Sequence, residues 1–328
     1  MRVLIIGAAG MIGRKLTDRL VRDGQIGGAA IEALTLHDIV PAAPPPAAGM
    51  PVTVETGDLT MAGEADRLIA ARPDIVFHLA AIVSGQAEQE FELGYRINMD
   101  GTRALLEAIR GAQCCPRLVF SSSIVVFGAP FPDAIGDEFL VAPLTSYGTQ
   151  KAICELLIAD YTRKGFVDGV ALRLPTICVR PGKPNAAASG FFSGIIREPL
   201  IGQEAVLPVS EDVMHWHASP RAAIGFLVHA AALDGEKLGA RRTLTMPGVA
   251  ITVGGQIDAL RAVAGDAVAA RIRREPDPFI QSIIAGWPRR FDARRALELG
   301  FEAEDSFEEI IRVHIEDELG GSIEPNLC

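Results

Sequence analysis

The sequence predicts an α/β protein with a doubly wound parallel sheet, followed by a smaller C-terminal α/β substrate lobe. Residues 1–180 alternate short, wholly apolar runs with longer amphipathic stretches, which is typical of strands covered by helices on both faces. A glycine-rich segment joins the first apolar run to the first amphipathic stretch. Such a segment is typical of sheets that bind a nucleotide at the start of a helix.

The expected elements follow one another in a regular order. The apolar runs are four to six residues long and rich in β-branched side chains, which favours strands. The expected strands span residues 2–6, 33–37, 52–55, 75–79, 117–121 and 169–174. The expected helices span residues 11–23, 63–71, 94–110 and 146–164.

The alternation ends after residue 174, and Gly, Pro and Asn cluster at residues 181–185. Shorter and less regular elements are expected from there to the C-terminus. We therefore expect a nucleotide-binding domain over residues 1–180 and a substrate-binding lobe over residues 181–328. The chain is free to pass back and forth between the two lobes.

Composition excludes several classes of protein. Hydrophobic residues make up 49% and charged residues 22% of the chain, which predicts a large core and argues against disorder. A net charge of −10 without a basic run argues against nucleic-acid binding. No apolar run is long enough for a membrane span, and no signal segment is expected. The five cysteines lack metal-ligand spacing, so we expect reduced thiols, a cytoplasmic protein and no metal site.

The glycine-rich segment GAAGMIG at residues 7–13 is the expected pyrophosphate site. Glycines there allow a tight turn, close approach of the phosphates and close packing of the helix on the strand. Free N–H groups at the helix start would receive the phosphate charge. The residues expected to bind are Gly7, Gly10, Met11, Ile12 and Gly13.

A carboxylate stands at the end of the second strand. Asp38 would accept hydrogen bonds from both ribose hydroxyls and would repel a 2′-phosphate, which favours NAD over NADP; a solvated strand-end Asp is the alternative. Its neighbour His37 is expected at the surface, and His78 in the core. Further cofactor contacts are expected after the third and fourth strands, at Asp58, Leu59, Leu79, Ala80 and Ala81.

Tyr147 and Lys151 open the last predicted helix of the first lobe. Their i, i+4 spacing puts both side chains on one helix face. An isolated phenol has a pKa near 10, and a neighbouring ammonium lowers it towards the range of a general base. The alternative is a Tyr and a Lys that merely lie on the helix surface. Ser121–Ser123 end the fifth strand, at the sheet edge where ligands bind.

Five segments, in this order, resemble the extended short-chain dehydrogenases/reductases, also called the NAD-dependent epimerase/dehydratase family, whose sheet is of the Rossmann type. The resemblance covers nearly the whole chain, because residues 291–301 are similar to the family's C-terminal signature. The five segments are GAAGMIG (7–13), HLAA (78–81), NMDGT (98–102), SSSIVVFG (121–128) and YGTQK (147–151).

The resemblance implies roles for individual residues. Tyr147 would be the catalytic acid/base, Lys151 would orient it and hold the nicotinamide ribose, and the Ser123 hydroxyl would contact the reacting oxygen. The implied cofactor is NAD. The resemblance adds further cofactor contacts at Ser122, Asn98, Pro175 and Ile177.

The second half departs from family members that act on nucleotide sugars. Residues 216–221 lack the two acids that those members carry there, whereas residues 174–184 are similar to members acting on small free sugar acids. The implied reaction is NAD-dependent oxidation of the 2-hydroxyl of a small sugar acid. Arg180 is the expected carboxylate clamp, with a surface arginine as the alternative, and His217 is expected either in the pocket wall or in the core. The remaining expected substrate contacts are Ser84, Ser123, Tyr147, Thr176, Asn185 and Ser189.

Two other functions stay open. A nucleotide-sugar epimerase or dehydratase would keep NAD tightly bound, and a non-catalytic NAD-sensing protein would have no turnover. The family's long helices, here residues 94–110 and 146–164, imply a homodimer, and the second carries the apolar stripe Ile153, Leu156, Leu157 and Tyr161.

Overall fold

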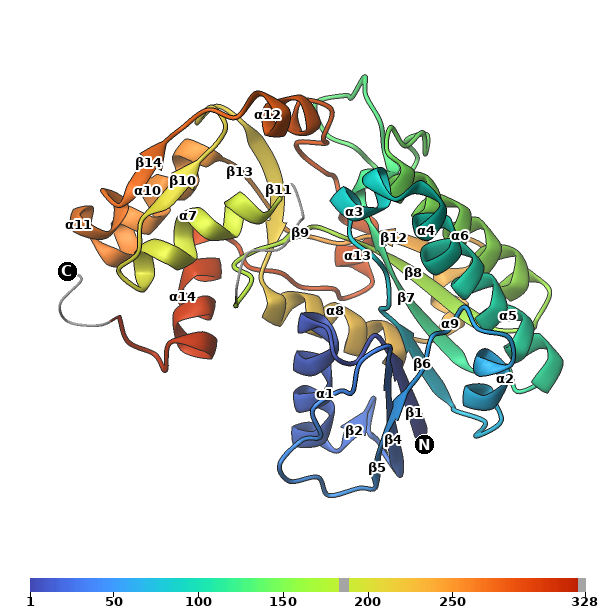
Figure 1. The fold of residues 1–328 in the computed structure, drawn as a ribbon. Coiled ribbons are helices and arrows are strands. Elements are labelled where there is room, and N and C mark those ends of the chain that lie inside the picture. Colours follow the sequence, from blue (N-terminus) through green and yellow to red (C-terminus); the bar gives the residue numbers. More distant parts are fainter. Residues whose placement is uncertain (183–188, 324–328) are drawn as a thin grey trace. The chain divides into compact units, whose positions relative to one another are not determined.

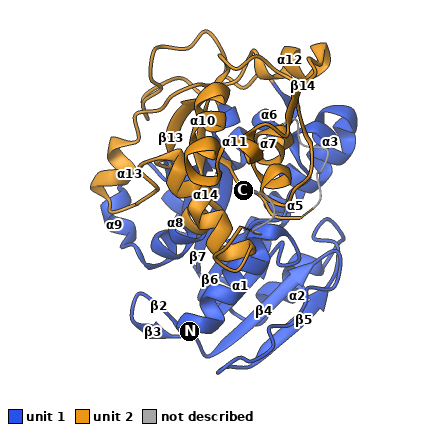
Figure 2. Ribbon diagram, turned by 90° about the vertical axis from the view of Figure 1, so that its left-hand side faces the viewer, with its two compact units in different colours: residues 1–126, 145–174, 224–245 blue, residues 127–144, 175–223, 246–328 orange. Residues whose placement is uncertain are grey.

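The protein, described here from a computed structural model, comprises two compact units (Figure 2). The structure describes residues 1–182 and 189–323. Unit 1 contains Met1–Val126, Thr145–Leu174 and Ile224–Thr245, and unit 2 contains Phe127–Leu144, Pro175–Ala223 and Met246–Cys328. The chain thus passes back and forth between the units, as the expectation of lobes over residues 1–180 and 181–328 allowed. One return brings the short strand β12 (Thr243–Thr245) into unit 1, where it pairs with β8 (Asp168–Leu174).

Unit 1 contains a seven-stranded sheet in the order β12-β8-β7-β6-β1-β4-β5. Every neighbouring pair is parallel, which confirms the doubly wound fold class. The strand order reverses between β1 (Arg2–Ile6) and β6 (Ile75–His78), the place where such sheets bind ligands. The other strands are β4 (Ala33–Asp38), β5 (Val52–Thr56) and β7 (Arg117–Ser123).

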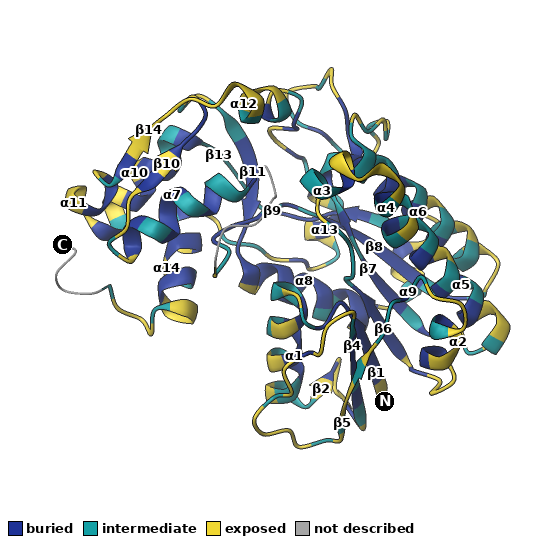
Figure 3. Ribbon diagram, in the orientation of Figure 1, coloured by how far each residue is buried: buried dark blue, intermediate teal, exposed yellow. Residues whose placement is uncertain are grey.

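Alternate strand residues face opposite layers of helices. On one face, Leu4, Ile6 and Phe120 pack with residues of α2 (Glu64–Ile69), α5 (Gly101–Ala112) and α6 (Ser146–Arg163). Figure 1 shows α1 (Met11–Asp23) and α8 (Pro220–Ala232) on the opposite face. The inner strands β1, β6, β7 and β8 are mostly buried between these layers, as their continuous apolar runs predicted, whereas the edge strand β5 is largely exposed (Figure 3).

The expected helix over residues 94–110 is a composite. It consists of α4 (Phe91–Gly94), a π-helical segment η1 (Tyr95–Asp100) and α5. A wider π turn inside a helix often marks a functional position, and this one carries Asn98. The helix α3 (Ser84–Gln89) was not predicted, because its six residues are too few to show a helical period.

Unit 2 has its own core and two small sheets. The core gathers apolar residues from α7 (Gly190–Leu200), α10 (Val253–Ala264) and α14 (Phe307–Glu318). One sheet has the order β13-β11-β9 and the other pairs β10 with β14. Its remaining elements are β9 (Thr176–Ile177), β10 (Ala205–Leu207), β11 (Met214–Ala218), β13 (Val249–Thr252), α11 (Asp266–Ala269), β14 (Ile272–Arg274), α12 (Pro278–Ile284) and α13 (Arg294–Glu298). Short elements complete unit 1: β2 (Gln25–Ile26), β3 (Ala29–Ala30), η2 (Ile124–Val126) and α9 (Gly235–Leu238).

Candidate active site

A cavity of about 390 Å³ lies in unit 1 at the carboxyl ends of β1, β4, β5 and β6. Its position is the reversal point of the strand order, as expected for a dinucleotide site. Most of the residues assigned to the cofactor from the second, third and fourth strands line it. The assigned residues in its lining are Gly7, Gly10, Asp38, Asp58, Leu59, Leu79, Ala80 and Ala81.

The glycine-rich turn fits a pyrophosphate. Gly7 has φ +95°, and a Cβ there would lie 2.5 Å from the backbone nitrogen of Ala80. A Cβ on Gly13 would lie 2.2 Å from the Gly7 carbonyl oxygen, so α1 packs directly on the turn. No side chain caps the start of α1 at Gly10, and its first turn has no acidic residue. The helix N-terminus can therefore receive an anion.

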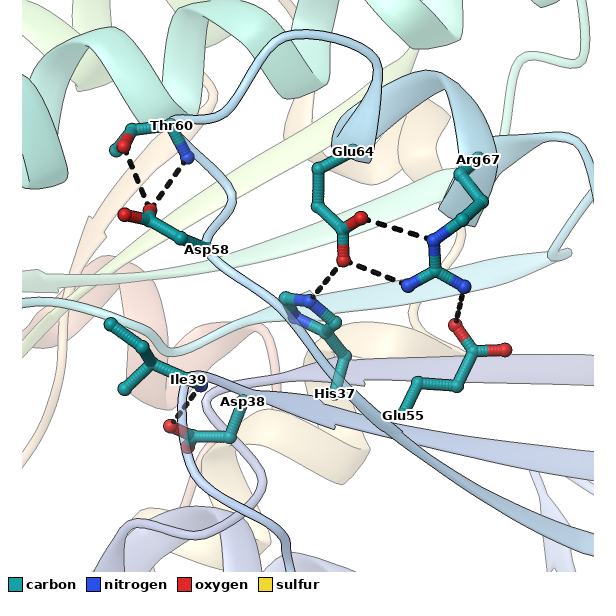
Figure 4. A network of polar contacts seen from close by, with 8 residues as sticks. All are labelled: His37, Asp38, Ile39, Glu55, Asp58, Thr60, Glu64 and Arg67. Atoms are coloured by element: carbon teal, nitrogen blue, oxygen red, sulfur yellow. Dashed lines mark hydrogen bonds and ion pairs between the residues drawn. The ribbon is translucent and has the colours of Figure 1, made fainter.

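Asp38 is held at the rim of this turn. Its Oδ2 accepts a hydrogen bond from the backbone nitrogen of Ala9 at 2.9 Å, and its Oδ1 accepts one from Ile39 at 2.7 Å. Across the cavity, Asp58 Oδ1 accepts hydrogen bonds from the backbone nitrogen and the hydroxyl of Thr60, at 2.9 and 2.8 Å. Figure 4 shows Asp38 with Ile39 and Asp58 with Thr60. Both are anchored by backbone N–H groups, which fixes the donors and acceptors that a ribose or a base would meet.

His37 is buried, so the expectation that it lies at the surface is wrong. Its Nε2 lies 2.9 Å from Glu64 Oε1, and Glu64 accepts a hydrogen bond from Arg67 at 2.7 Å (Figure 4). Arg67 also donates to Glu55 at 2.5 Å. The hydrogen bond from Arg67 lowers the pKa of Glu64, ahead of the one from His37. A Cβ on Gly57 would lie 2.0 Å from Glu64 Oε1, so this network packs tightly beneath the cavity.

His78 lies in the core, as its apolar neighbours predicted. Its Nε2 is 2.8 Å from the Thr102 hydroxyl, and its ring packs against Phe120 at a centroid distance of 5.5 Å. Burial lowers its pKa to about 3, so the imidazole is neutral at physiological pH. His78 thus packs within the sheet through Thr102 and Phe120, at a position that also lines the cavity.

Tyr147 and Lys151 lie together in the first two turns of α6. The Lys151 Nζ is 5.6 Å from the centroid of the Tyr147 ring and 4.5 Å from that of Phe120, and it donates to the Ser121 carbonyl oxygen at 2.7 Å. Burial lowers the pKa of Lys151 to about 8, against the charges of Cys154 and Glu155, which raise it. The ammonium is therefore retained at neutral pH, close to the phenol whose ionisation it favours.

The three serines at the end of β7 face different surroundings. Ser121 and Ser123 are half-buried, and Ser123 Oγ accepts a hydrogen bond from the backbone nitrogen of Val125 at 3.4 Å. Ser122 is buried, and its hydroxyl donates to Glu155 at 2.5 Å. Because residues alternate along a strand, Ser121 and Ser123 share one face and Ser122 points to the other.

Asn98 links three segments from its place in the π turn. Its Oδ1 accepts a hydrogen bond from the backbone nitrogen of Ile82 at 2.9 Å, and its Nδ2 donates to Gln150 at 2.7 Å. Ile82 follows the strand end that lines the cavity, and Gln150 precedes Lys151 on α6. Asn98 therefore connects the cavity wall to the catalytic helix.

Most of the expected substrate residues lie in unit 2. Thr176 on β9 has its hydroxyl 2.7 Å from His215 Nε2. Arg180 donates through Nε to the Ile177 carbonyl oxygen at 2.9 Å and through Nη2 to the Ser189 hydroxyl at 2.8 Å.

His217 is fully buried against the rings of Phe192, His215 and Phe307, so it is placed in the core of unit 2. Pro175 and Ile177 are buried in the same unit. Asn185 lies outside the described residues, and Ser84 begins α3 in unit 1.

A role near the catalytic residues was not predicted from the sequence for Gln150, Glu155 and Arg173. All three are buried polar residues close to the catalytic helix. The available signal was the position of Glu155, which lies four residues after Lys151 and therefore on the same helix face. Its buried partner Arg173 lies on β8, so only the three-dimensional structure shows the pair.

Two features are absent from the described residues. No helix there is long and apolar enough to cross a membrane. In the same residues, no group of three or more His, Cys, Asp or Glu side chains is arranged to hold a metal ion.

A family model and two curated relatives match most or nearly all of this chain. The family model described as the NAD dependent epimerase/dehydratase family matches residues 3–217. The D-erythronate dehydrogenase of Cupriavidus necator is 49% identical over 321 residues, which cover 97% of this chain and 98% of that protein. The D-erythronate dehydrogenase of Haemophilus influenzae is 43% identical over 317 residues, which cover 96% and 99%.

Solved structures give the same architecture. A crystal structure described as the nucleoside-diphosphate-sugar epimerase from Agrobacterium tumefaciens has a TM-score of 0.97 and 62% identity, covering 99% of this chain and 96% of that one. An L-threonine dehydrogenase from Cupriavidus necator has a TM-score of 0.84 at 23% identity, over 97% of this chain and 99% of that one. The second likeness concerns the fold alone.

Proposed function

The chain belongs to the NAD-dependent epimerase/dehydratase family, and we propose that it oxidises the 2-hydroxyl of a small sugar acid, D-erythronate in the first place. It is an NAD-dependent oxidoreductase. The observation that carries the proposed chemistry is the position of the Lys151 ammonium. It lies beside the Tyr147 ring and donates a hydrogen bond to the Ser121 carbonyl oxygen near the end of β7. This arrangement provides a base activated for removing a hydroxyl proton.

NAD would be held at the glycine-rich turn and Asp38 in the cavity, and it would supply the hydride acceptor for the substrate carbon. Tyr147, as the phenolate, takes the proton of the substrate 2-hydroxyl. At the same time the C–H bond of the carbon that carries this hydroxyl breaks, and the carbonyl forms. Lys151 stabilises the phenolate by its charge, and the Ser123 hydroxyl donates to the oxygen that becomes the carbonyl. The products are the keto acid, NADH and a neutral Tyr147 phenol, which returns its proton to solvent.

A sugar acid is supported by two observations. Two relatives that match this chain over nearly its full length are named D-erythronate dehydrogenase. In addition, residues 216–221 lack the acids carried by family members that act on nucleotide sugars. The proposal assigns the substrate carboxylate to Arg180, whose planar guanidinium can donate two parallel hydrogen bonds when it exchanges those it makes to Ile177 and Ser189.

The proposal is tested by incubating the purified protein with NAD and a panel of four- to six-carbon sugar acids, following NADH absorbance. NADH should accumulate with a four-carbon acid well beyond the enzyme concentration. The neutral sugar or polyol of the same carbon number serves as the matched control. Equal turnover of the neutral compound would contradict recognition of an acid.

The second candidate is a nucleotide-sugar epimerase, because a structure 62% identical to this chain is described by that name. An epimerase returns the hydride to its substrate, so it releases no net NADH and purifies with its cofactor. Conversion of a UDP-sugar without NADH release, combined with inactivity towards all sugar acids, would favour this candidate. A non-catalytic NAD sensor is disfavoured, because Tyr147 and Lys151 are both present and lie together.

We also propose a cytoplasmic homodimer formed through α5 and α6. Leu156 on α6 is 72% exposed, although Leu157 and Tyr161 of the same stripe pack on the core. Burial of this exposed leucine against a second copy of the chain would stabilise the dimer. Light scattering should give twice the monomer mass, and Leu156→Arg should give the monomer. A wild-type monomer at micromolar concentration would contradict the dimer.

A further inference from the structure

Three buried polar residues connect β8, α6 and β7 next to the catalytic residues. Arg173 on β8 donates from Nε and Nη2 to the two carboxylate oxygens of Glu155, at 2.9 and 2.7 Å. Glu155 Oε1 also accepts the hydrogen bond of the Ser122 hydroxyl at 2.5 Å. Glu155 and Ser122 are each 3% exposed and Arg173 is 5% exposed. The three side chains form a continuous chain of contacts inside unit 1, out of reach of solvent.

Glu155, the central residue of these contacts, lies on the same face of α6 as the catalytic residues. Tyr147, Lys151 and Glu155 are spaced by four residues, so they occupy successive turns of one helix face. Lys151 binds the carbonyl oxygen of Ser121, and Glu155 binds the hydroxyl of Ser122. Two consecutive residues of β7 are thus tethered to two consecutive turns of α6. The next residue of the strand is Ser123.

We propose that Glu155 is a positioning residue that holds the Ser123 hydroxyl in register with Tyr147. The inference rests on the proposed function, because it assigns Glu155 to the same proton-transfer step. The end of β7 is paired with β8 as far as Ser123–Leu174, but the contact from Lys151 joins the strand to α6 only through a backbone carbonyl. The second contact, one residue further, fixes both the height and the orientation of the strand end relative to the helix.

The buried ion pair itself argues for a role beyond stability. Removing two charges from water costs several kcal/mol per ion, and apolar residues of similar volume often stabilise a protein equally well. What apolar residues cannot supply is an acceptor for the Ser122 hydroxyl. Reacting groups must be held close to the productive geometry, and a displacement of about 1 Å can cost roughly a hundredfold in rate.

The test uses two variants that remove the tether in different ways. Ser122→Ala removes the hydroxyl and leaves the Glu155–Arg173 pair intact. The double variant Glu155→Met/Arg173→Met removes the acceptor and leaves no unpaired buried charge, so it is expected to fold. Both should lower kcat about ten- to a hundredfold. KM should stay within about twofold in both variants, and the NAD dissociation constant should do so in the double variant, because Glu155 is buried and does not line the cofactor cavity. Backbone amides of residues 122–126 should exchange hydrogen faster in both variants.

The matched control is Asp168→Asn, at the opposite end of the same strands. Asp168 begins β8 and pairs with Arg117, which begins β7, at 3.0 Å. This variant should lower the melting temperature and leave kcat and the exchange of residues 122–126 unchanged.

Wild-type kcat in the double variant would overturn the proposal, and so would a loss of kcat in the control as large as in the tether variants. A wild-type protein inactive on every sugar acid would refute the proposed function instead. The exchange rate of residues 122–126 would then still decide whether Glu155 holds the strand end.

Discussion

Replacing Gly13 by alanine measures how closely α1 packs on the turn after β1. A Cβ at this position would lie 2.2 Å from the Gly7 carbonyl oxygen, 2.7 Å from Ala8 Cα and 2.9 Å from the Ala8 carbonyl carbon. All three atoms belong to the backbone, so no side chain can rotate away. Overpacking of this kind costs roughly 1–3 kcal/mol. We expect Gly13→Ala at the upper end of that range, which lowers the melting temperature of the 328-residue chain by about 4 °C.

Gly10→Ala is the matched control, because Gly10 lines the cavity and meets no such obstruction. The nearest atom to its added Cβ is the Gly7 carbonyl oxygen at 3.4 Å, and its φ of −68° suits alanine. Stability should change by less than about 0.5 kcal/mol. The methyl group would occupy space needed by the pyrophosphate, so NAD should bind roughly ten- to two-hundredfold more weakly.

Scanning calorimetry and NAD titration separate these two effects. We expect Gly13→Ala to lose both stability and NAD affinity, and Gly10→Ala to lose NAD affinity alone. Wild-type stability and wild-type NAD affinity in Gly13→Ala would refute the packing argument.

Three other predictions concern cofactor choice, substrate charge and pH. Asp38→Ala should weaken NAD binding about ten- to a hundredfold and narrow the preference for NAD over NADP, as measured by kcat/KM with each cofactor; equal use of NADP by the wild type would contradict the role of Asp38. Arg180→Lys should raise KM for D-erythronate about ten- to a hundredfold and spare NAD affinity, since lysine cannot donate the paired hydrogen bonds; an unchanged KM would place the carboxylate elsewhere. Burial lowers the pKa of His78 to about 3 and that of His215 to about 4, both from 6.5. In this pH range the unfolded chain therefore binds more protons than the folded protein, so the free energy of unfolding should fall as the pH decreases from about 6.5 to about 4. Urea titrations should show that this free energy depends less steeply on pH in His78→Gln than in the wild type. An identical pH dependence in the two proteins would contradict the burial argument.

The elements predicted correctly from the sequence are those that have a local sequence pattern. The strand at residues 2–6 and the helix at residues 11–23 have the bounds that were expected, because continuous apolar runs and a glycine turn are local signals. β12 could not be predicted, since the three residues Thr243–Thr245 become a strand only by pairing with the edge strand β8. Its place in the sheet is a long-range effect without a local pattern.

The same distinction holds in the site. Tyr147 and Lys151 are four residues apart in sequence, so their proximity follows from helix geometry. His37 is flanked by the carboxylate Asp38 and was therefore expected at the surface. It is buried because Glu64, 27 residues away, approaches it from α2. Glu155 and Arg173 form their pair between a helix and a strand, and a single sequence carries no sign of such a partner.

The most direct test of the account compares the wild type with Tyr147→Phe under identical conditions, with D-erythronate and NAD. The wild type should produce NADH in many turnovers. Tyr147→Phe keeps the ring that packs beside Lys151 and loses only the hydroxyl, so it should bind NAD normally and form NADH roughly 10²–10⁴-fold more slowly. A Phe variant that retains most of the wild-type kcat would show that Tyr147 is not the proton acceptor.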